Sequence, residues 1–270
     1  MVDVHSNSIF AEGIHPTAIV SSSAEIGDGT TIGPYSIVGP NVKLGKGNKI
    51  SSHVVLDGYT TLGDENVVYP FASVGTAPQD LKFKGEKSLL LIGNKNLIRE
   101  YVTLQPGTEG GGMKTIIGDK NLFMANCHVG HDGIVGNGNV FANSCALAGH
   151  VTVGDRVTVG GLTGIHQFVK IGDFSIMGAG SMVAKDIPPF CIAHGDRAHL
   201  IGINKLGLER GGMSDSEITK IQSLFKKLFY SKNPFAERLE SVSKEFEGFA
   251  PAQKMIDFIK TSERGVTFPR

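Results

Sequence analysis

The sequence predicts a parallel β-helix built from hexapeptide units, followed by a small α-helical domain. Three observations predict this fold class. Glycine accounts for 36 of the 270 residues, roughly twice its ~7% background. Apolar residues recur at every sixth position over most of the chain, and helical spacing replaces that period near the C-terminus. We expect the β-helix over residues 1–190 and the helical domain over residues 191–270.

The hexad repeat first runs from Ile14 to Val74, with a large apolar residue at each step, usually a small residue two positions earlier and often a glycine one position later. Strand alternation places the small and the large residue on one face, which forms the interior. The glycine suits a corner, where φ is positive or the backbone approaches its neighbour closely. Each hexad is therefore a short strand and a corner, and three hexads of 18 residues make the smallest closed coil.

Two segments interrupt the repeat before it ends. Residues 76–91 keep the phase of six and fit either a degenerate coil or an excursion, whereas residues 105–116 shift the phase by one and must be an excursion. Loops of this kind on a rigid scaffold are favoured places for function. The repeat then runs from Ile117 to Val183 and ends at Asp186-Ile-Pro-Pro-Phe190, because two prolines cannot serve a continuing strand ladder.

The C-terminal segment has helical signals. Ser214-Asp-Ser-Glu217 is a capping box in front of an apolar stripe at helical spacing, so a helix is expected to begin there. Pro234 and Pro251 are expected to begin two further helices. The basic stretch from Lys220 to Lys232 is either a solvated face or a docking surface for an acidic carrier protein.

Composition excludes several classes of function. Lys and Arg number 26, Asp and Glu also number 26, and this balance gives no overall attraction for nucleic acid or an anionic membrane. Three cysteines are too few, and odd in number, for a disulfide framework, which points to a reducing compartment or to incidental thiols. The chain begins without a signal-peptide pattern and contains no apolar run of the ~18 residues that a membrane span needs. We expect a soluble, cytoplasmic protein with no nucleic-acid partner and no integral membrane segment.

Histidines cluster between residues 128 and 166. Because the coil has 18 residues, positions 18 apart stack on successive coils, about 4.8 Å from one coil to the next. The cluster gathers at one corner, with His128 one short strand away. The three neighbouring columns contain His131, Gly149 and Gln167; Asp132 and His150; and His166.

Two chemistries suit clustered imidazoles. One is a zinc site with an open position for water, as in a zinc hydratase. The other is general base catalysis, in which Asp132 orients His131 and the bare backbone N–H of Gly149 faces an oxyanion. The second chemistry gives a role to more of the cluster, and no serine or cysteine is placed beside His131 as a nucleophile. A scaffold without enzymatic function is the non-catalytic alternative.

Several motifs resemble one enzyme family, the acyl-carrier-protein–UDP-N-acetylglucosamine O-acyltransferases within the hexapeptide-repeat acyltransferases. The similarity spans nearly the whole chain. The motifs are Gln79-Asp-Leu-Lys82, Asn126-Cys-His-Val-Gly-His-Asp132, Leu147-Ala-Gly-His150 and Gly164-Ile-His-Gln-Phe168. The resemblance implies a left-handed β-helix and a homotrimer with clefts between adjacent copies. It implies transfer of a 3-hydroxy fatty acyl group from acyl carrier protein to the sugar 3-hydroxyl, the first step of lipid A biosynthesis, without cofactor or metal.

The resemblance also implies roles for individual residues. His131 takes the proton of the sugar 3-hydroxyl, Asp132 supports it, and the Gly149 N–H holds the oxyanion. Ala179 matches the position that limits acyl-chain length. The implied substrate contacts are Asp80, Lys82, His128, His150 and Gln167 for the glucosamine or pantetheine, and His166, Asn204 and Arg210 for the nucleotide.

Departures from the family pattern leave related activities open. Gln105-Pro-Gly-Thr108 stands where His-Arg-Gly-Thr is usual, Gly211 replaces a basic residue, and Arg197 replaces a frequent histidine. An acyltransferase that prefers the 3-amino UDP-sugar is one alternative, and a zinc enzyme like the hexapeptide-repeat carbonic anhydrases is another. Because the net charge is zero, attraction for an acidic carrier must come from local patches around Lys82, Arg210 and the first C-terminal helix.

Overall fold

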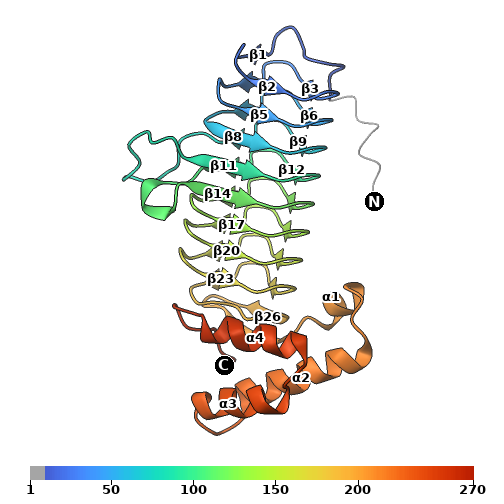
Figure 1. Ribbon diagram of the computed structural model, residues 1–270, viewed down its shortest axis with the longest axis vertical. Coiled ribbons are helices and arrows are strands. Elements are labelled where there is room, and N and C mark those ends of the chain that lie inside the picture. Colours follow the sequence, from blue (N-terminus) through green and yellow to red (C-terminus); the bar gives the residue numbers. More distant parts are fainter. Residues whose placement is uncertain (1–9) are drawn as a thin grey trace.

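The structure, a computed structural model, describes residues 10–270, and the part of the predicted β-helix before residue 10 lies outside them. Short strands stack along the long axis of the molecule and the helices gather at its C-terminal end (Figure 1). The strands form three sheets, and each regular coil adds one strand to each sheet. The fold is a left-handed parallel β-helix with a small helical C-terminal part, as predicted.

The three sheets are named here I, II and III. Sheet I contains β1 (Ile19–Val20), β4 (Ile37–Val38), β7 (Val55–Leu56), β10 (Ser73–Val74), β13 (Thr103–Leu104), β16 (His128–Val129), β19 (Ala146–Leu147), β22 (Gly164–Ile165) and β25 (Met182–Val183). Sheet II contains β2 (Glu25–Ile26), β5 (Lys43–Leu44), β8 (Tyr59–Leu62), β11 (Leu89–Ile92), β14 (Lys114–Ile117), β17 (Ile134–Val135), β20 (Thr152–Val153) and β23 (Lys170–Ile171). Sheet III contains β3 (Thr31–Ile32), β6 (Lys49–Ile50), β9 (Val67–Val68), β12 (Leu97–Ile98), β15 (Leu122–Phe123), β18 (Val140–Phe141), β21 (Thr158–Val159), β24 (Ile176–Met177), β26 (Cys191–His194) and β27 (His199–Ile203).

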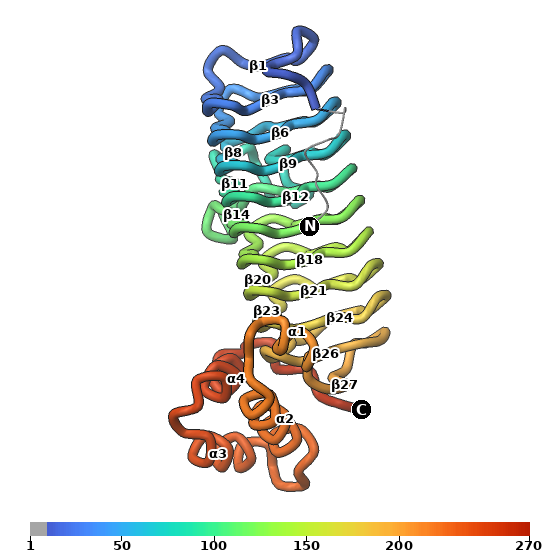
Figure 2. Tube along the Cα trace, turned by 90° about the vertical axis from the view of Figure 1, so that its right-hand side faces the viewer, coloured from blue at the N-terminus to red at the C-terminus, as the bar shows by residue number. Residues whose placement is uncertain are grey.

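The strand register follows the 18-residue coil. Val129 pairs with Leu147, and Leu147 pairs with Ile165, so equivalent positions stack directly along the axis. These large apolar side chains are almost fully buried and fill the interior of each coil. Stacked coils in Figure 2 show the same repeat from the side. The predicted stacking of the histidine columns is therefore confirmed.

The hexad glycines are expected to allow either a positive φ or a close approach of the backbone. Close approach holds at Gly27. A Cβ on Gly27 would lie 2.5 Å from the carbonyl carbon of Gly45 on the next coil, far inside van der Waals contact. Positive φ holds at Gly75 (82°), and elsewhere in the β-helix it also occurs at non-glycine corner residues, among them Asp132 (58°) and His150 (63°). The corner that turns through these residues is the one that carries the histidine cluster.

Both interruptions are excursions at the corner between sheets I and II, called here the I–II corner. Ser73 pairs with Thr103, 30 residues later, and Thr103 pairs with His128, 25 residues later, instead of 18. The degenerate-coil interpretation of residues 76–91 is therefore wrong, because an insertion that is a multiple of six keeps the phase. The two loops project side by side near β11 and β14 in Figure 1. His131 lies at the same corner of the following coil, so both loops reach the histidine cluster.

Strand pairing continues past the two prolines. Ile176 in β24 pairs with Ile192 in β26, and β26 then turns back as an antiparallel hairpin with β27. The division of the chain into domains at residue 190 stays a prediction. The helices are α1 (Lys205–Arg210), α2 (Asp215–Tyr230), α3 (Phe235–Glu245) and α4 (Ala250–Lys260), with a 3₁₀ turn at Glu109–Gly111.

The helix starts follow the sequence signals. Both hydrogen bonds of the predicted capping box are present between Ser214 and Glu217, and α2 begins there. Pro234 directly precedes α3, and Pro251 stands in the first turn of α4. Helix α1 was not predicted. Within residues 10–270 no helix combines the length and the apolarity that crossing a bilayer requires.

Candidate active site

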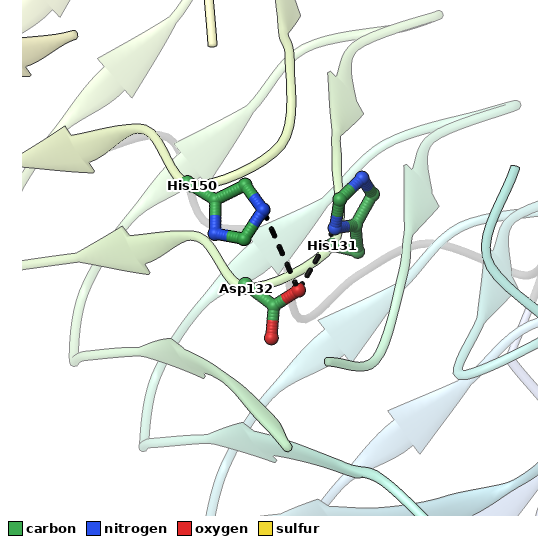
Figure 3. Close-up of side chains that lie close together, drawn as sticks. All are labelled: His131, Asp132 and His150. Carbon is green, nitrogen blue, oxygen red and sulfur yellow. Dashed lines mark hydrogen bonds and ion pairs between the residues drawn. The ribbon is translucent and has the colours of Figure 1, made fainter. Parts of the chain in front are cut away.

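His131 and Asp132 form a hydrogen-bonded pair at the I–II corner, directly after β16 (Figure 3). The positive φ of Asp132 turns its side chain under the coil, where it is fully buried, and its Oδ2 lies 2.8 Å from Nδ1 of His131. A carboxylate only accepts hydrogen bonds, so in the neutral ring of His131 the proton lies on Nδ1 and the lone pair on Nε2. The pair therefore presents a basic nitrogen toward the outside of the coil.

Gly149 lies against this basic nitrogen from the next coil. A Cβ on Gly149 would lie 2.5 Å from both Nε2 and Cε1 of His131, so only glycine leaves the ring in its place. The Gly149 N–H donates to no acceptor within residues 10–270. A buried, unused N–H beside a general base is the arrangement that can stabilise an oxyanion.

His150 packs against the pair from the side. Its ring meets the His131 ring edge-on, with centroids 5.0 Å apart, and stacks on Phe168 at 4.3 Å. Its Nε2 lies 4.0 Å from Asp132 Oδ2. Burial lowers the pKa of His150, and the charges of His131 and Lys82 act in the same direction, against the opposing carboxylates of Asp132 and Asp80. His150 is therefore a neutral hydrogen-bonding group near pH 7.

His128 lines the same site from β16. Its Nδ1 lies 2.7 Å from the hydroxyl oxygen of Thr103 on the preceding coil. Burial lowers the pKa of His128, and the charge of His131 lowers it further. Like His150, His128 is therefore neutral near pH 7.

The lowered pKa values of His128 and His150 predict a loss of stability in mild acid. As pH falls below the unfolded value of about 6.5, the unfolded chain takes up protons that the folded chain does not, so the free energy of unfolding falls. We expect the difference in Tm between pH 8 and pH 5.5 to be smaller in His128→Gln than in the wild type, measured by calorimetry. The exposed His194→Gln variant is the control and should keep the wild-type difference. An unchanged difference in His128→Gln would contradict the assignment.

The first excursion brings Asp80 and Lys82 to the site. Asp80 Oδ2 lies 4.0 Å from Nε2 of His131, and its Oδ1 accepts a hydrogen bond of 3.0 Å from the backbone N–H of Lys82. The Asp80 side chain is four-fifths buried, so the loop covers the basic side of the imidazole. The roles of Asp80 and Lys82 in substrate binding stay predictions.

A cavity of about 580 Å³ opens in front of the pair along sheet I. Its polar wall includes His128, His131 and His166, and Gly149 and Met182 also line it. Gln167 is exposed in the column of His131 and Gly149 but outside this lining, and Ala179 is exposed at the corner before β25. The roles of Gln167 in substrate binding and of Ala179 in acyl length stay predictions.

A second cavity, of about 810 Å³, lies on sheet III and contains Asn204 and Arg210. Asn204 caps α1: its Oδ1 accepts from the Gly207 N–H at 2.9 Å, and its Nδ2 donates to the Phe174 carbonyl at 2.7 Å. The exposed Arg210 ends that helix. Within one copy of the chain, Asn204 and Arg210 thus lie on another face from His166, the third predicted nucleotide contact, and the roles of all three stay predictions.

Sequence reasoning missed Thr108, in the second excursion. Its backbone N–H donates to Asp132 Oδ1 at 2.9 Å, and its hydroxyl donates to Oδ2 at 2.6 Å. The threonine stands in the segment already compared with the family pattern, Gln105-Pro-Gly-Thr108, but the repeat register cannot place a residue that lies outside the coils. The motif therefore contains the threonine, but its hydrogen bonds to Asp132 depend on the path of the second excursion, which the sequence pattern does not give.

His131, Asp132 and His150 also have ligand atoms within 4.8 Å of one another, which suits a metal ion by distance alone. Asp132 Oδ2, however, already accepts hydrogen bonds from Thr108 and from His131. A metal bound through Oδ2 of Asp132 and Nδ1 of His131 would replace the hydrogen bond between them. The donor set is therefore arranged for a hydrogen-bonded acid–base pair.

Comparison with known proteins gives the same family along most of the chain. A family model described as UDP N-acetylglucosamine O-acyltransferase, domain 2, matches residues 186–267. A second model, described as bacterial transferase hexapeptide (six repeats), matches residues 23–58. An acyl-[acyl-carrier-protein]–UDP-N-acetylglucosamine O-acyltransferase of Myxococcus xanthus is 47% identical over 94% of this chain and 98% of that protein. A protein of the same name from Aliarcobacter butzleri is 46% identical over 95% and 98%.

Solved structures agree with the sequence relatives. A crystal structure of a UDP-N-acetylglucosamine acyltransferase superposes with a TM-score of 0.92, at 43% identity, over 95% of this chain and 99% of that one. The likeness includes the β-helix and the helical end together. On this identity and coverage, the chain belongs to the acyl-[acyl-carrier-protein]–UDP-N-acetylglucosamine O-acyltransferase family.

Proposed function

We propose that the protein transfers a 3-hydroxy fatty acyl group from acyl carrier protein to the 3-hydroxyl of UDP-N-acetylglucosamine, the first step of lipid A biosynthesis. The family supports the reaction and both substrates. The observation that carries the mechanism is the His131–Asp132 pair facing the unused N–H of Gly149 in one cavity.

The proposed reaction is a direct transfer. Nε2 of His131 takes the proton of the sugar hydroxyl while its oxygen attacks the thioester carbonyl, and Asp132 stabilises the imidazolium that forms. The tetrahedral oxyanion accepts a hydrogen bond from the Gly149 N–H. As the carbon–sulfur bond breaks, the imidazolium returns the proton to the leaving sulfur, which gives the free carrier thiol. The described lining of the cavity contains no serine or cysteine that could carry the acyl group first.

Substrate contacts are assigned by chemistry. The neutral His128 and His150 suit sugar hydroxyls and amides, and Asp80 and Lys82 offer an acceptor and a donor beside them. Gln167 and His166 extend the same corner toward the next coils, and Ala179 stays the proposed limit of acyl length. Arg210 suits a diphosphate, because its guanidinium makes forked hydrogen bonds. Lys82, Arg210 and the basic stretch Lys220–Lys232 would attract an acidic carrier protein.

We further propose a homotrimer in the cytoplasm. The histidines line a cavity on sheet I, whereas Arg210 lies in a cavity on sheet III. If sheet I of one copy faces sheet III of the next, a closed three-fold arrangement completes three identical sites. Light scattering should give three times the 28.7 kDa of one chain, and a monomer would contradict the proposal. The three cysteines are free thiols, as in a reducing compartment.

One assay tests the proposed function. Purified protein, treated with a chelator, is supplied with carrier loaded with acyl groups of several lengths and with either UDP-N-acetylglucosamine or its 3-amino analogue. We expect turnover with the hydroxyl sugar, a product acylated at O-3, and no loss after metal removal. Preference for the amine would favour the N-acyl alternative. A stoichiometric requirement for zinc would support the hydratase alternative and contradict the metal-free mechanism.

A further inference from the structure

We infer that Thr108 is a positioning residue for the reaction: by holding Asp132 with two hydrogen bonds, it fixes the orientation of His131. The inference rests on the proposed function of the His131–Asp132 pair. Thr108 belongs to the second excursion, and its side chain is hydrogen-bonded to Asp132 and not to the imidazole. Its effect passes through the carboxylate.

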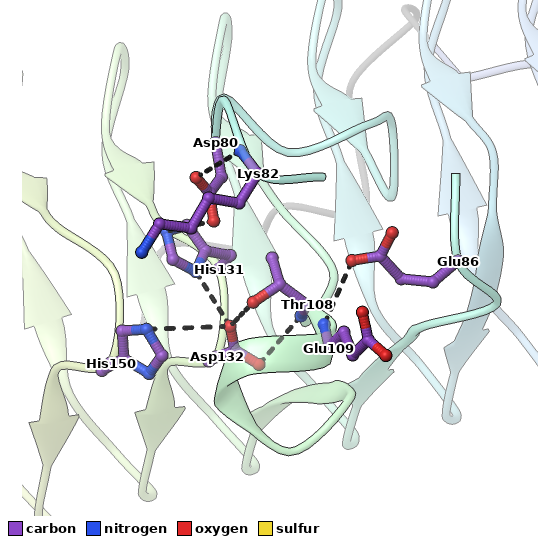
Figure 4. A network of polar contacts seen from close by, with 8 residues as sticks. All are labelled: Asp80, Lys82, Glu86, Thr108, Glu109, His131, Asp132 and His150. Atoms are coloured by element: carbon purple, nitrogen blue, oxygen red, sulfur yellow. Dashed lines mark hydrogen bonds and ion pairs between the residues drawn. The ribbon is translucent and has the colours of Figure 1, made fainter. Parts of the chain in front are cut away.

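The two hydrogen bonds from Thr108 use both oxygens of one carboxylate. The backbone N–H donates to Oδ1, and the hydroxyl donates to Oδ2, the oxygen that also accepts from Nδ1 of His131 (Figure 4). Thr108 is 4% exposed and the Asp132 side chain is fully buried, so water does not compete for these contacts. Because Thr108 donates to both oxygens of Asp132, its two hydrogen bonds hold the carboxylate in the orientation that accepts from the imidazole of His131.

The second excursion is shaped to close over this carboxylate. A Cβ on Gly111 would lie 1.9 Å from Cγ of Asp132, so the loop approaches as closely as glycine allows. The column of Asp132 continues in His150 and Phe168 on the next coils, and Phe168 is 49% exposed. A residue at this position of the column is therefore not buried by the coils themselves. In the coil of His131, the second excursion buries Asp132.

The two excursions are tied to each other. Glu86 in the first accepts a hydrogen bond of 3.1 Å from the backbone N–H of Glu109 in the second, and one of 2.8 Å from Lys84 N–H within its own loop. These backbone donors lower the pKa of Glu86, which keeps it an acceptor. Asp80 in the first excursion lies near Nε2 of His131, and Thr108 in the second acts through Asp132 on Nδ1. The tied loops thus set the surroundings of both imidazole nitrogens.

The test replaces the hydroxyl of Thr108 while keeping the shape of the side chain. Thr108→Val retains the backbone hydrogen bond and loses the one to Oδ2. We expect kcat to fall about 10- to 100-fold, the range for a hydrogen bond to a charged group, with KM for both substrates within about twofold of wild type. Thr108→Ser, which keeps both donors, should restore most of kcat.

Thr115→Val is the matched control. Thr115 is a fully buried threonine on β14 whose hydroxyl has no hydrogen-bond partner within the described chain, so the same change there should leave kcat unaltered. If Thr108→Val does not fold, Thr108→Ala is compared with Thr108→Ser in its place, with the same expectation for kcat. The serine and the apolar variant having equal kcat would overturn the inference, as would a rise in KM at unchanged kcat. If the wild type itself does not acylate UDP-N-acetylglucosamine, the proposed function is wrong, which is a different result from a change that separates the Thr108 variants.

Discussion

Replacing His131 with alanine is expected to lower kcat by about 10³-fold or more, because a general base contributes roughly 10²–10⁴-fold and no other imidazole among residues 10–270 is hydrogen-bonded to a buried carboxylate. The His131 side chain is 17% exposed and is hydrogen-bonded to the buried Asp132, so its loss is expected to cost about 1–3 kcal/mol and to lower Tm by several degrees, with the β-helix still folded. The measurement is steady-state turnover with UDP-N-acetylglucosamine and 3-hydroxyacyl carrier, beside a thermal melt.

The exposed His194→Gln variant serves as the control, since it removes an imidazole outside the cavity and should keep wild-type turnover. A folded His131→Ala variant with near-wild-type kcat would remove the base from the mechanism. Such a result would leave the fold and the family membership intact, because neither depends on this side chain.

The Gly149→Ala variant should lose about 10²-fold or more in kcat. The added Cβ would lie 2.5 Å from Nε2 of His131, so either the imidazole must move from the sugar hydroxyl or the backbone must move from the oxyanion. Loss of a single oxyanion donor alone costs about 10²–10³-fold in well-studied hydrolases. Steady-state kinetics with both substrates measures the loss.

A glycine in open space provides the comparison for Gly149. A Cβ on Gly202 in β27 meets nothing within 4 Å, so Gly202→Ala should have wild-type kcat and similar stability. Equal activity of the two alanine variants would contradict the place given to Gly149 beside the base.

The repeat register explains why so much of the site could be predicted from the sequence. Backbone pairing between coils fixes an 18-residue period, so His131, Gly149 and Gln167 had to stack. The same reasoning fails where the chain leaves the coils. Residues 75–88 contain an insertion that keeps the phase of six, and the period alone cannot distinguish it from a coil.

Tertiary geometry decides what the period leaves open. Thr108 reaches Asp132 only because the second excursion folds back over the corner, and no local pattern in Gln105-Pro-Gly-Thr108 encodes that path. Asn204 was expected to contact the nucleotide, and the structure shows its amide engaged as the cap of α1. The separation of Arg210 from the histidines likewise depends on which sheet each residue borders.

Whether the acyl group passes straight from the carrier thioester to the sugar is decided by the intact mass of the protein. The enzyme is incubated with acyl carrier alone, quenched in acid and weighed by mass spectrometry, before and after UDP-N-acetylglucosamine is added. Direct transfer at His131 predicts an unchanged protein mass at both points and acylated sugar only after the second. A stoichiometric gain of one acyl group without sugar, lost when sugar is added, would contradict it.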